Sequence, residues 1–303
     1  MSLKTTSFFI LLLVAPFLGI AQRIASVGNF MNNQLIYNPA AAGMHEAQFN
    51  TSLVTSFQMT GVEGAPLTNF LWADYRSKSG KSAIGLNLNY DKFGVSKNTD
   101  IYGNYSYNIR LNRKLKLAFG LKMGITRIYY STSDLTRIWD PGDVYAANIT
   151  IKTVLPKAGA GLQLQSKKSY IGFSLPDLIT YDKNNVMNND GNSFFKQKRN
   201  YTLMAGTKYK INDSYSFNPN VMVFYYPGAS MILDVNALFE ITDYFWAGGT
   251  YSTSHQHSLM AGTNISSRIK FGYAYRFKTG PVTLSTHELN LRVSMDDLFS
   301  KKK

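Results

Sequence analysis

The sequence contains no cysteine in its 303 residues. A chain without cysteine is not a lipoprotein and has no disulfide framework, so packing or lipid must stabilise it. After the first 21 residues, no stretch reaches the roughly 18 consecutive apolar residues that mark a transmembrane helix. The sequence therefore excludes a small disulfide-bonded scaffold and a bundle of membrane-spanning helices.

Acidic residues are also scarce, because 18 Asp and Glu accompany 32 Lys and Arg, for a formal net charge of +14 at pH 7. Nucleic acid is not an expected partner, because the leader described below predicts export. Anionic lipid head groups, lipopolysaccharide and acidic protein surfaces fit this charge better.

Histidine is rare as well, with four in the chain. His255 and His257 share one face of an expected strand, but no further ligand lies nearby in sequence, so we expect no metal site. Ser174 lies in "GFSLP", which lacks the final glycine of a nucleophile elbow. We therefore expect no catalytic residue, no metal and no cofactor. A lipase that uses Ser174 and His257 is the weakest of three functional hypotheses.

The first feature that is present in the sequence is an N-terminal leader. "MSLKTTSFFILLLVAPFLGIAQ" carries Lys4, then an apolar stretch from Phe8 to Ile20, then small residues near its end. This pattern predicts a signal peptide over 1–21 and an exported mature chain that begins near Gln22.

Period-two alternation dominates the rest. In "LKLAFGLKMGITRIYY" (115–130), apolar residues alternate with lysine, glycine, alanine and threonine, which predicts a strand with one apolar face. Read in this way, the chain holds about 14 strands near 47–59, 67–76, 82–91, 99–111, 115–130, 156–165, 168–176, 200–211, 214–226, 229–241, 243–252, 256–265, 267–278 and 285–295. Strands of about 10 residues suit a tilted membrane strand. Aromatic residues at expected strand ends, including Tyr225, Tyr244 and Trp246, resemble interface girdles.

Every second connection is short, and the two long connections both fall among the others. Short turns such as "SKSGK" (77–81) and "NRK" (112–114) fall on one side of an up-and-down barrel, and the long segments 131–155 and 177–199 fall on the other. Outer-membrane barrels have short periplasmic turns, so we expect both termini in the periplasm. The alternative is a soluble sandwich or lipocalin-like barrel, but a closed sheet of this width is too wide for its side chains to fill.

These patterns predict an all-β fold, a transmembrane up-and-down antiparallel barrel over 47–295, followed by a basic tail over 296–303. We expect residues 22–46 to form an ordered periplasmic segment docked in the barrel mouth, with Pro39 fixing its bend. A mobile tail is the alternative for this segment.

The more polar register of the strands holds nine basic residues and four acidic residues: Arg110, Lys116, Lys122, Lys208, Lys210, Lys270, Arg276, Lys278 and Arg292, with Asp91, Asp234, Glu240 and Glu288. We expect charge pairing inside the barrel, and an anion-preferring pore is the alternative.

"NFMNNQLIYNPAAAGM" (29–44) resembles the opening signature of the PorP/SprF family of type IX secretion system membrane proteins. The matching positions are Phe30, Met31, Asn33, Asn38, Pro39, Ala40, Ala42 and Gly43. Four further stretches match in order: "GAPLT" (64–68) with Gly64, Pro66 and Thr68, "IGLNLNYDKFG" (84–94) with Asp91 and Gly94, "YIGFSLPDL" (170–178) with Pro176, and "THELNLRVSM" (286–295) with His287 and Glu288. The basic tail after Met295 departs from a barrel that ends on an aromatic residue.

The resemblance implies a non-enzymatic outer-membrane protein of an apparatus used for secretion and often for gliding motility. It implies partners among the periplasmic ring and peptidoglycan-tethering proteins and a secreted surface cargo such as an adhesin. The opening signature, from Phe30 to Gly43, is then the expected contact for a periplasmic partner. A diffusion porin or small-solute channel is the alternative function.

Overall fold

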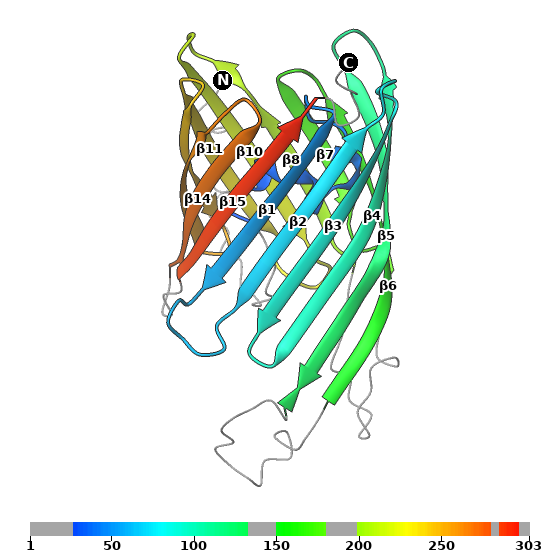
Figure 1. Ribbon diagram of the computed structural model, residues 1–303, viewed down its shortest axis with the longest axis vertical. Coiled ribbons are helices and arrows are strands. Elements are labelled where there is room, and N and C mark those ends of the chain that lie inside the picture. The colour runs from blue at the N-terminus through cyan, green and yellow to red at the C-terminus, as the bar shows by residue number, and fades with distance from the viewer. Residues whose placement is uncertain (1–26, 133–149, 180–198, 280–284, 297–303) are drawn as a thin grey trace, which may run out of the picture.

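The computed structural model describes residues 27–132, 150–179, 199–279 and 285–296. They form one antiparallel sheet, which closes because β1 (Phe49–Gln58) pairs with β15 (Ser285–Met295). The strands between are β2 (Leu67–Arg76), β3 (Ser82–Phe93), β4 (Ser96–Arg110), β5 (Lys116–Ser131), β6 (Thr150–Gln165), β7 (Ser169–Leu175), β8 (Tyr201–Thr207), β9 (Tyr209–Lys210), β10 (Tyr215–Tyr225), β11 (Ile232–Ile241), β12 (Phe245–Ser252), β13 (Gln256–Asn264) and β14 (Ile269–Lys278). Neighbours in sequence are neighbours in the sheet, so the barrel is up-and-down, as predicted (Figure 1).

The strand predicted over 200–211 is interrupted, and its two parts are β8 and β9. Both pair with β10 in the same register, with Asn220 opposite Gly206 and Phe217 opposite Tyr209. Pro219 lies between these pairs, and proline has no N–H to donate to a ladder. β8 and β9 therefore occupy one position, and the barrel has 14 strands.

One long connection is shorter than expected, because β6 begins at Thr150 rather than near 156. Pro156 lies inside β6, where it pairs with Ile125 of β5. β7 pairs with β6 only from Ala160 to Gln165, so Pro156 lies on a part of β6 that is an edge within the described sheet. Proline is tolerated at such edges.

The apolar face of the strands points outward. On β5, Leu121 and Met123 are 59% and 71% exposed, whereas Lys122 between them is 5% exposed. A soluble barrel buries its apolar face, so this arrangement excludes the lipocalin-like alternative and places the chain in an outer membrane. Trp246 was expected in an interface girdle, but its side chain points inward and is buried. Its ring lies over Gly262 and Gly272, whose missing side chains leave room for it.

Six short turns lie together at the upper end of the barrel in Figure 1, where β2 leads into β3, β4 into β5, and so on around the sheet. The opposite end holds the two long loops, together with the short turns between β3 and β4 and between β12 and β13. We call the upper end the short-turn mouth and the opposite end the long-loop mouth. No helix among the described residues is long and apolar enough to cross a membrane. The leader (1–21) and most of the basic tail and of both long loops lie outside the described residues.

Candidate functional site

Residues 27–46, here called the luminal segment, extend along the inside of the barrel. Gly28 lies near the long-loop mouth, where it contacts Glu288 on β15. Gly43 lies near the short-turn mouth, where its N–H donates to Asp74 on β2 over 2.8 Å. The sequence predicted a segment at one mouth, whereas the structure places it along the lumen between both ends. Val27, the first described residue, therefore lies away from the short-turn mouth, and a periplasmic N-terminus stays a prediction.

Three short 3₁₀ helices make the luminal segment compact: η1 (Phe30–Asn32), η2 (Gln34–Ile36) and η3 (Pro39–Ala41). The side chain of Asn38 caps η3 by accepting the Ala40 N–H over 3.0 Å, and Pro39 occupies the first position of η3. Proline suits this position because its fixed φ is preorganised and its missing N–H would be unpaired anyway. Gly43 then turns the chain with a φ of +71°, a region that favours glycine.

Asn33 fastens the middle of the segment to the barrel wall. Its Oδ1 accepts hydrogen bonds from Ser52 Oγ of β1 at 2.9 Å and from Trp72 Nε1 of β2 at 2.8 Å. Its Nδ2 donates to the carbonyl oxygen of Asn29 over 2.8 Å. Asn33 and Trp72 are both fully buried, so water does not replace these bonds.

We expect Asn33→Ala to lower the free energy of unfolding by about 2–3 kcal/mol, because it leaves the buried indole N–H of Trp72 without an acceptor. Asn32→Ala is the matched control, since the Asn32 side chain makes one hydrogen bond, to Asn29. Denaturant unfolding of the protein in lipid vesicles checks both variants. Equal losses would show that Asn33 has no special part in docking.

Asn38 and η3 pack against glycines of β5 and β6 in the barrel wall. The Asn38 Nδ2 donates to the Leu162 carbonyl oxygen over 3.1 Å and to Gln163 Oε1 over 3.2 Å, both on β6. A Cβ on Gly161 would lie 2.0 Å from Asn38 Oδ1, and a Cβ on Gly120 of β5 would lie 2.1 Å from the Ala40 nitrogen. The backbone of the segment therefore approaches the wall too closely for any side chain at these two positions.

A cluster of polar groups holds the segment at the short-turn mouth. Arg76 Nη1 donates to the His45 carbonyl oxygen over 2.7 Å, and Nη2 donates to the Glu46 carbonyl oxygen over 2.6 Å. The His45 ring stacks on Trp72 with centroids 5.3 Å apart. Burial, together with the nearby charges of Arg292 and Arg76, lowers the pKa of His45 well below its usual range. His45 is therefore neutral at physiological pH.

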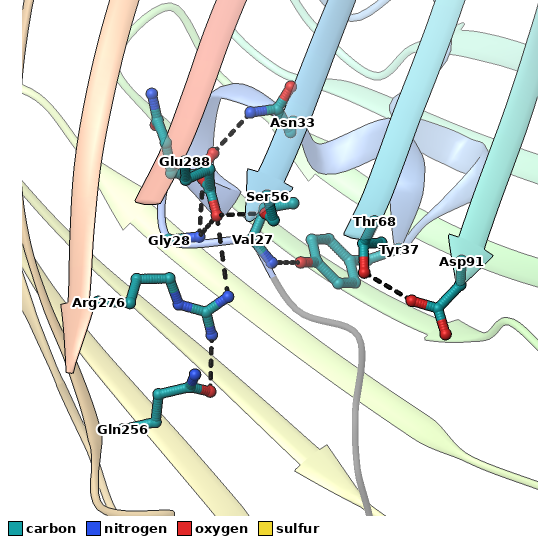
Figure 2. Close-up of polar contacts among 11 residues, drawn as sticks. Val27, Gly28, Asn33, Tyr37, Ser56, Thr68, Asp91, Gln256, Arg276 and Glu288 are labelled. Atoms are coloured by element: carbon teal, nitrogen blue, oxygen red, sulfur yellow. Dashed lines mark hydrogen bonds and ion pairs between the residues drawn. The ribbon is translucent and has the colours of Figure 1, made fainter. Parts of the chain in front are cut away.

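Glu288 holds the other end of the segment (Figure 2). Its carboxylate is 1% exposed and accepts the Gly28 N–H, with both oxygens 3.0 Å from the nitrogen. Ser56 Oγ donates to the same carboxylate over 3.3 Å, and Arg276 Nη1 lies 3.8 Å away. Arg276 Nη2 in turn donates to Gln256 over 2.9 Å. The charge pairing expected inside the barrel is present here.

Two of the matching stretches meet at the long-loop mouth. Thr68 donates to Asp91 across β2 and β3 over 2.6 Å, as Figure 2 shows, and the Gly94 N–H donates to the Gly64 carbonyl oxygen over 2.9 Å. Gly64 and Gly94 both have positive φ, at +73° and +53°. "GAPLT", which contains Pro66, and "DKFG" therefore form one joined pair of loops.

The remaining matching positions lie apart from that pair. Pro176 packs on Gly159, where a Cβ would lie 2.6 Å from the Pro176 oxygen. His287 lies on the outward face of β15, next to the inward Glu288, and its Nδ1 hydrogen-bonds Tyr273 over 2.8 Å. These adjacent residues of β15 thus point to opposite faces of the sheet.

The six signature residues expected to contact a partner are all inside the barrel: Phe30, Asn33, Asn38, Pro39, Ala42 and Gly43. In this structure they contact the barrel wall. Sequence reasoning missed the wall residues that receive them, chiefly Trp72, Asp74 and Gly120. One signal in the sequence could have found them. This tryptophan, acid and glycine lie on the inward register of strands that were predicted to line the lumen.

Ser174 and His257 do not meet, since Ser174 is buried and donates to the Tyr37 carbonyl oxygen, whereas the ring of His257 contacts Tyr251 and Phe277 of neighbouring strands. In the part of the chain that the structure describes, no group of three or more His, Cys, Asp or Glu has the arrangement of a metal site.

A pocket of about 160 Å³ opens at the short-turn mouth, beside the luminal segment. Met31, Leu238 and Trp246 supply apolar lining, and Asn218, Asn220 and Asn264 supply amides. Lys168, Lys208 and Lys270 also line it. The short turns around this mouth hold Lys78, Lys81, Arg113, Lys114, Lys167, Lys168 and Arg268, with Asp213 and Asp243. We call this set the basic rim.

Comparison with solved structures identifies barrels of outer-membrane transporters. The CymD monoaromatic hydrocarbon channel has a TM-score of 0.54 at 13% identity, over 91% of this chain and 95% of that one. The toluene transporter TbuX of Ralstonia pickettii has a TM-score of 0.54 at 11% identity, over 86% and 93%. The toluene transporter TodX of Pseudomonas putida has a TM-score of 0.51 at 12% identity, over 91% and 95%. These low identities show a shared fold alone.

No curated protein matches the chain in sequence. A family model described as "Type IX secretion system membrane protein PorP/SprF" matches residues 19–293, which is most of the chain. The match includes the luminal segment, the joined loops and Glu288, and it confirms the family that the resemblance predicted. The chain belongs to the PorP/SprF family of type IX secretion system membrane proteins.

Proposed function

We propose that this protein anchors the type IX secretion apparatus in the outer membrane or helps to secrete and attach a surface cargo such as an adhesin. The observation that carries the proposal is the family match over residues 19–293. Its partners are then the periplasmic ring and peptidoglycan-tethering proteins on one side and the cargo on the other. We also propose that it is not an enzyme.

The proposed orientation puts the short-turn mouth in the periplasm and the long-loop mouth outside, as in other outer-membrane barrels. The basic rim then faces the periplasmic machinery, and outer-membrane lipid and lipopolysaccharide surround the apolar outer face. Val27 lies toward the outer mouth in this orientation, while His45 and Glu46 lie toward the periplasm.

A diffusion porin or small-solute channel is the alternative. The structural neighbours are hydrocarbon channels by name, but their identity to this chain, 13% or less, carries no substrate across. The luminal segment favours the secretion role, because buried residues such as Phe30, Leu35 and Ala40 occupy the lumen that a porin leaves to water.

Deletion of the gene in its own bacterium tests the proposal. We expect loss of at least one type IX substrate from the cell surface, measured by mass spectrometry of surface proteins and restored by the wild-type gene. A deletion strain that secretes and displays every type IX substrate would refute the secretion role. Impaired uptake of a small solute in that strain would favour the channel.

A further inference from the structure

The pocket at the short-turn mouth combines three kinds of lining that together fit a peptide. Its floor is apolar and buried, with Leu238 4% and Trp246 7% exposed. Lys168 and Lys270, both exposed, supply positive charge at its opening. A bare inorganic anion makes no favourable contact with the apolar floor, and an apolar small molecule makes none with the lysines.

The charges of the pocket are not balanced from within. Lys208 is paired with Glu240, whose other carboxylate oxygen accepts from Asn218 over 2.8 Å. Lys168 and Lys270 make no side-chain ion pair with any described residue. The pocket therefore keeps two ammonium groups available for a carboxylate.

Amide groups of the wall have unused acceptors as well. Asn218 donates to Glu240 and Asn264 donates to the Asp243 carbonyl oxygen, but the buried Oδ1 atoms of both residues accept no hydrogen bond from described residues. Asn218 and Asn264 both line the pocket, and such amide side chains suit a ligand that carries its own N–H and C=O groups. A peptide backbone carries such groups.

We propose that this pocket binds an acidic segment of a partner protein. One acidic side chain is held by Lys168 and Lys270, and one apolar side chain lies against Leu238 and Trp246. A volume of about 160 Å³ is the space of about five waters, so one or two side chains enter and the rest of the segment crosses the basic rim. The partner is periplasmic, a location that rests on the proposed function.

The barrel itself argues against a lipid head group as the occupant. Asn220, Leu238 and Trp246 lie on the inward register, with the wall between them and the membrane. The basic rim strengthens the attraction for an acidic protein, because clustered charges of one sign raise the rate at which an oppositely charged partner arrives.

Fluorescence anisotropy of the detergent-purified full chain tests the proposal. The probe is a labelled eight-residue peptide of alternating Glu and Leu, and its control is the same peptide with Gln for Glu. We expect the acidic peptide to bind at physiological salt and the Gln peptide to bind at least tenfold more weakly. Absence of binding by the acidic peptide, or equal binding of both, would overturn the proposal.

The site is tested with charge reversals that match in number and place. We expect Lys168→Glu with Lys270→Glu to raise the Kd at least tenfold, which is about 1.4 kcal/mol. Lys78→Glu with Lys114→Glu changes the same charge at the same mouth, outside the pocket, and we expect less than a threefold change. Equal losses would mean that only the diffuse charge of the rim attracts the peptide.

Competition separates the other sources of negative charge. If millimolar inorganic phosphate or phosphatidylglycerol vesicles displace the labelled acidic peptide as effectively as unlabelled peptide does, the peptide site is overturned. Failure of these binding tests would leave the secretion role intact, because surface display of the cargo is measured independently in cells.

Discussion

Gly120→Ala releases η3 from the barrel wall, whereas Gly103→Ala leaves it in place. A Cβ at position 120 would meet backbone atoms at 2.1–2.5 Å, from Pro39 and Ala40, and backbone has no rotamer by which to move away. Overpacking of this kind costs about 1–3 kcal/mol. We therefore expect the backbone amides of residues 40–44 to exchange with deuterium at least tenfold faster in the variant.

Gly103 is the matched control, because it lies on the neighbouring strand β4 and points outward. The nearest atom to a Cβ there is 3.9 Å away. Both variants make the same change in a strand, so differences in strand propensity cancel. A heat-modifiability gel reports whether the barrel remains closed, and unchanged exchange of the amides of residues 40–44 in Gly120→Ala would contradict the docking of η3.

Glu288→Gln is expected to destabilise the protein about as much as Asn33→Ala. It removes the charge that Gly28, Ser56 and Arg276 contact, including the carboxylate oxygen 3.8 Å from the guanidinium of Arg276, which is 8% exposed. Removal of one partner from a buried pair costs about 3–5 kcal/mol, and the retained amide oxygen of glutamine lowers this to roughly 2–3 kcal/mol. Denaturant unfolding in vesicles measures the loss.

The control for this change is Asp213→Asn, which neutralises a carboxylate whose partner Lys210 is 2.6 Å away at an exposed turn. We expect no measurable change there, since exposed ion pairs contribute little. Arg276→Gln added to Glu288→Gln is expected to cost less than the sum of the two single losses, because the double variant removes both charges of the pair. A double variant that is less stable than the sum of the two single losses would contradict the pairing.

The barrel was predictable from the sequence because each strand carries its own signal. On β5 and β14, apolar residues alternate with lysine, glycine or alanine, and the apolar set faces lipid in the structure. The short turns identified one mouth for the same local reason. Interruption of the strand at Lys208 was not predictable from the strand itself, since its cause, Pro219, lies on the paired strand.

The sequence predicted that an ordered luminal segment exists, but it did not predict the path of that segment through the barrel. Asn38, Pro39 and Gly43 indicated a bent, ordered piece, since each favours a turn. Its position along the lumen depends on contacts with Trp72, Glu288 and the glycines of β5 and β6, up to 260 residues away in sequence. Alternation identifies such wall residues as inward but says nothing about which segment they receive.

Planar-bilayer recording of the purified wild-type protein tests most directly the claim that its own N-terminal segment closes the barrel. We predict no steady conductance from the wild type, and repeated openings from a variant that lacks residues 27–44. Stable, porin-like conductance from the wild-type protein would contradict the closed lumen and favour a diffusion channel.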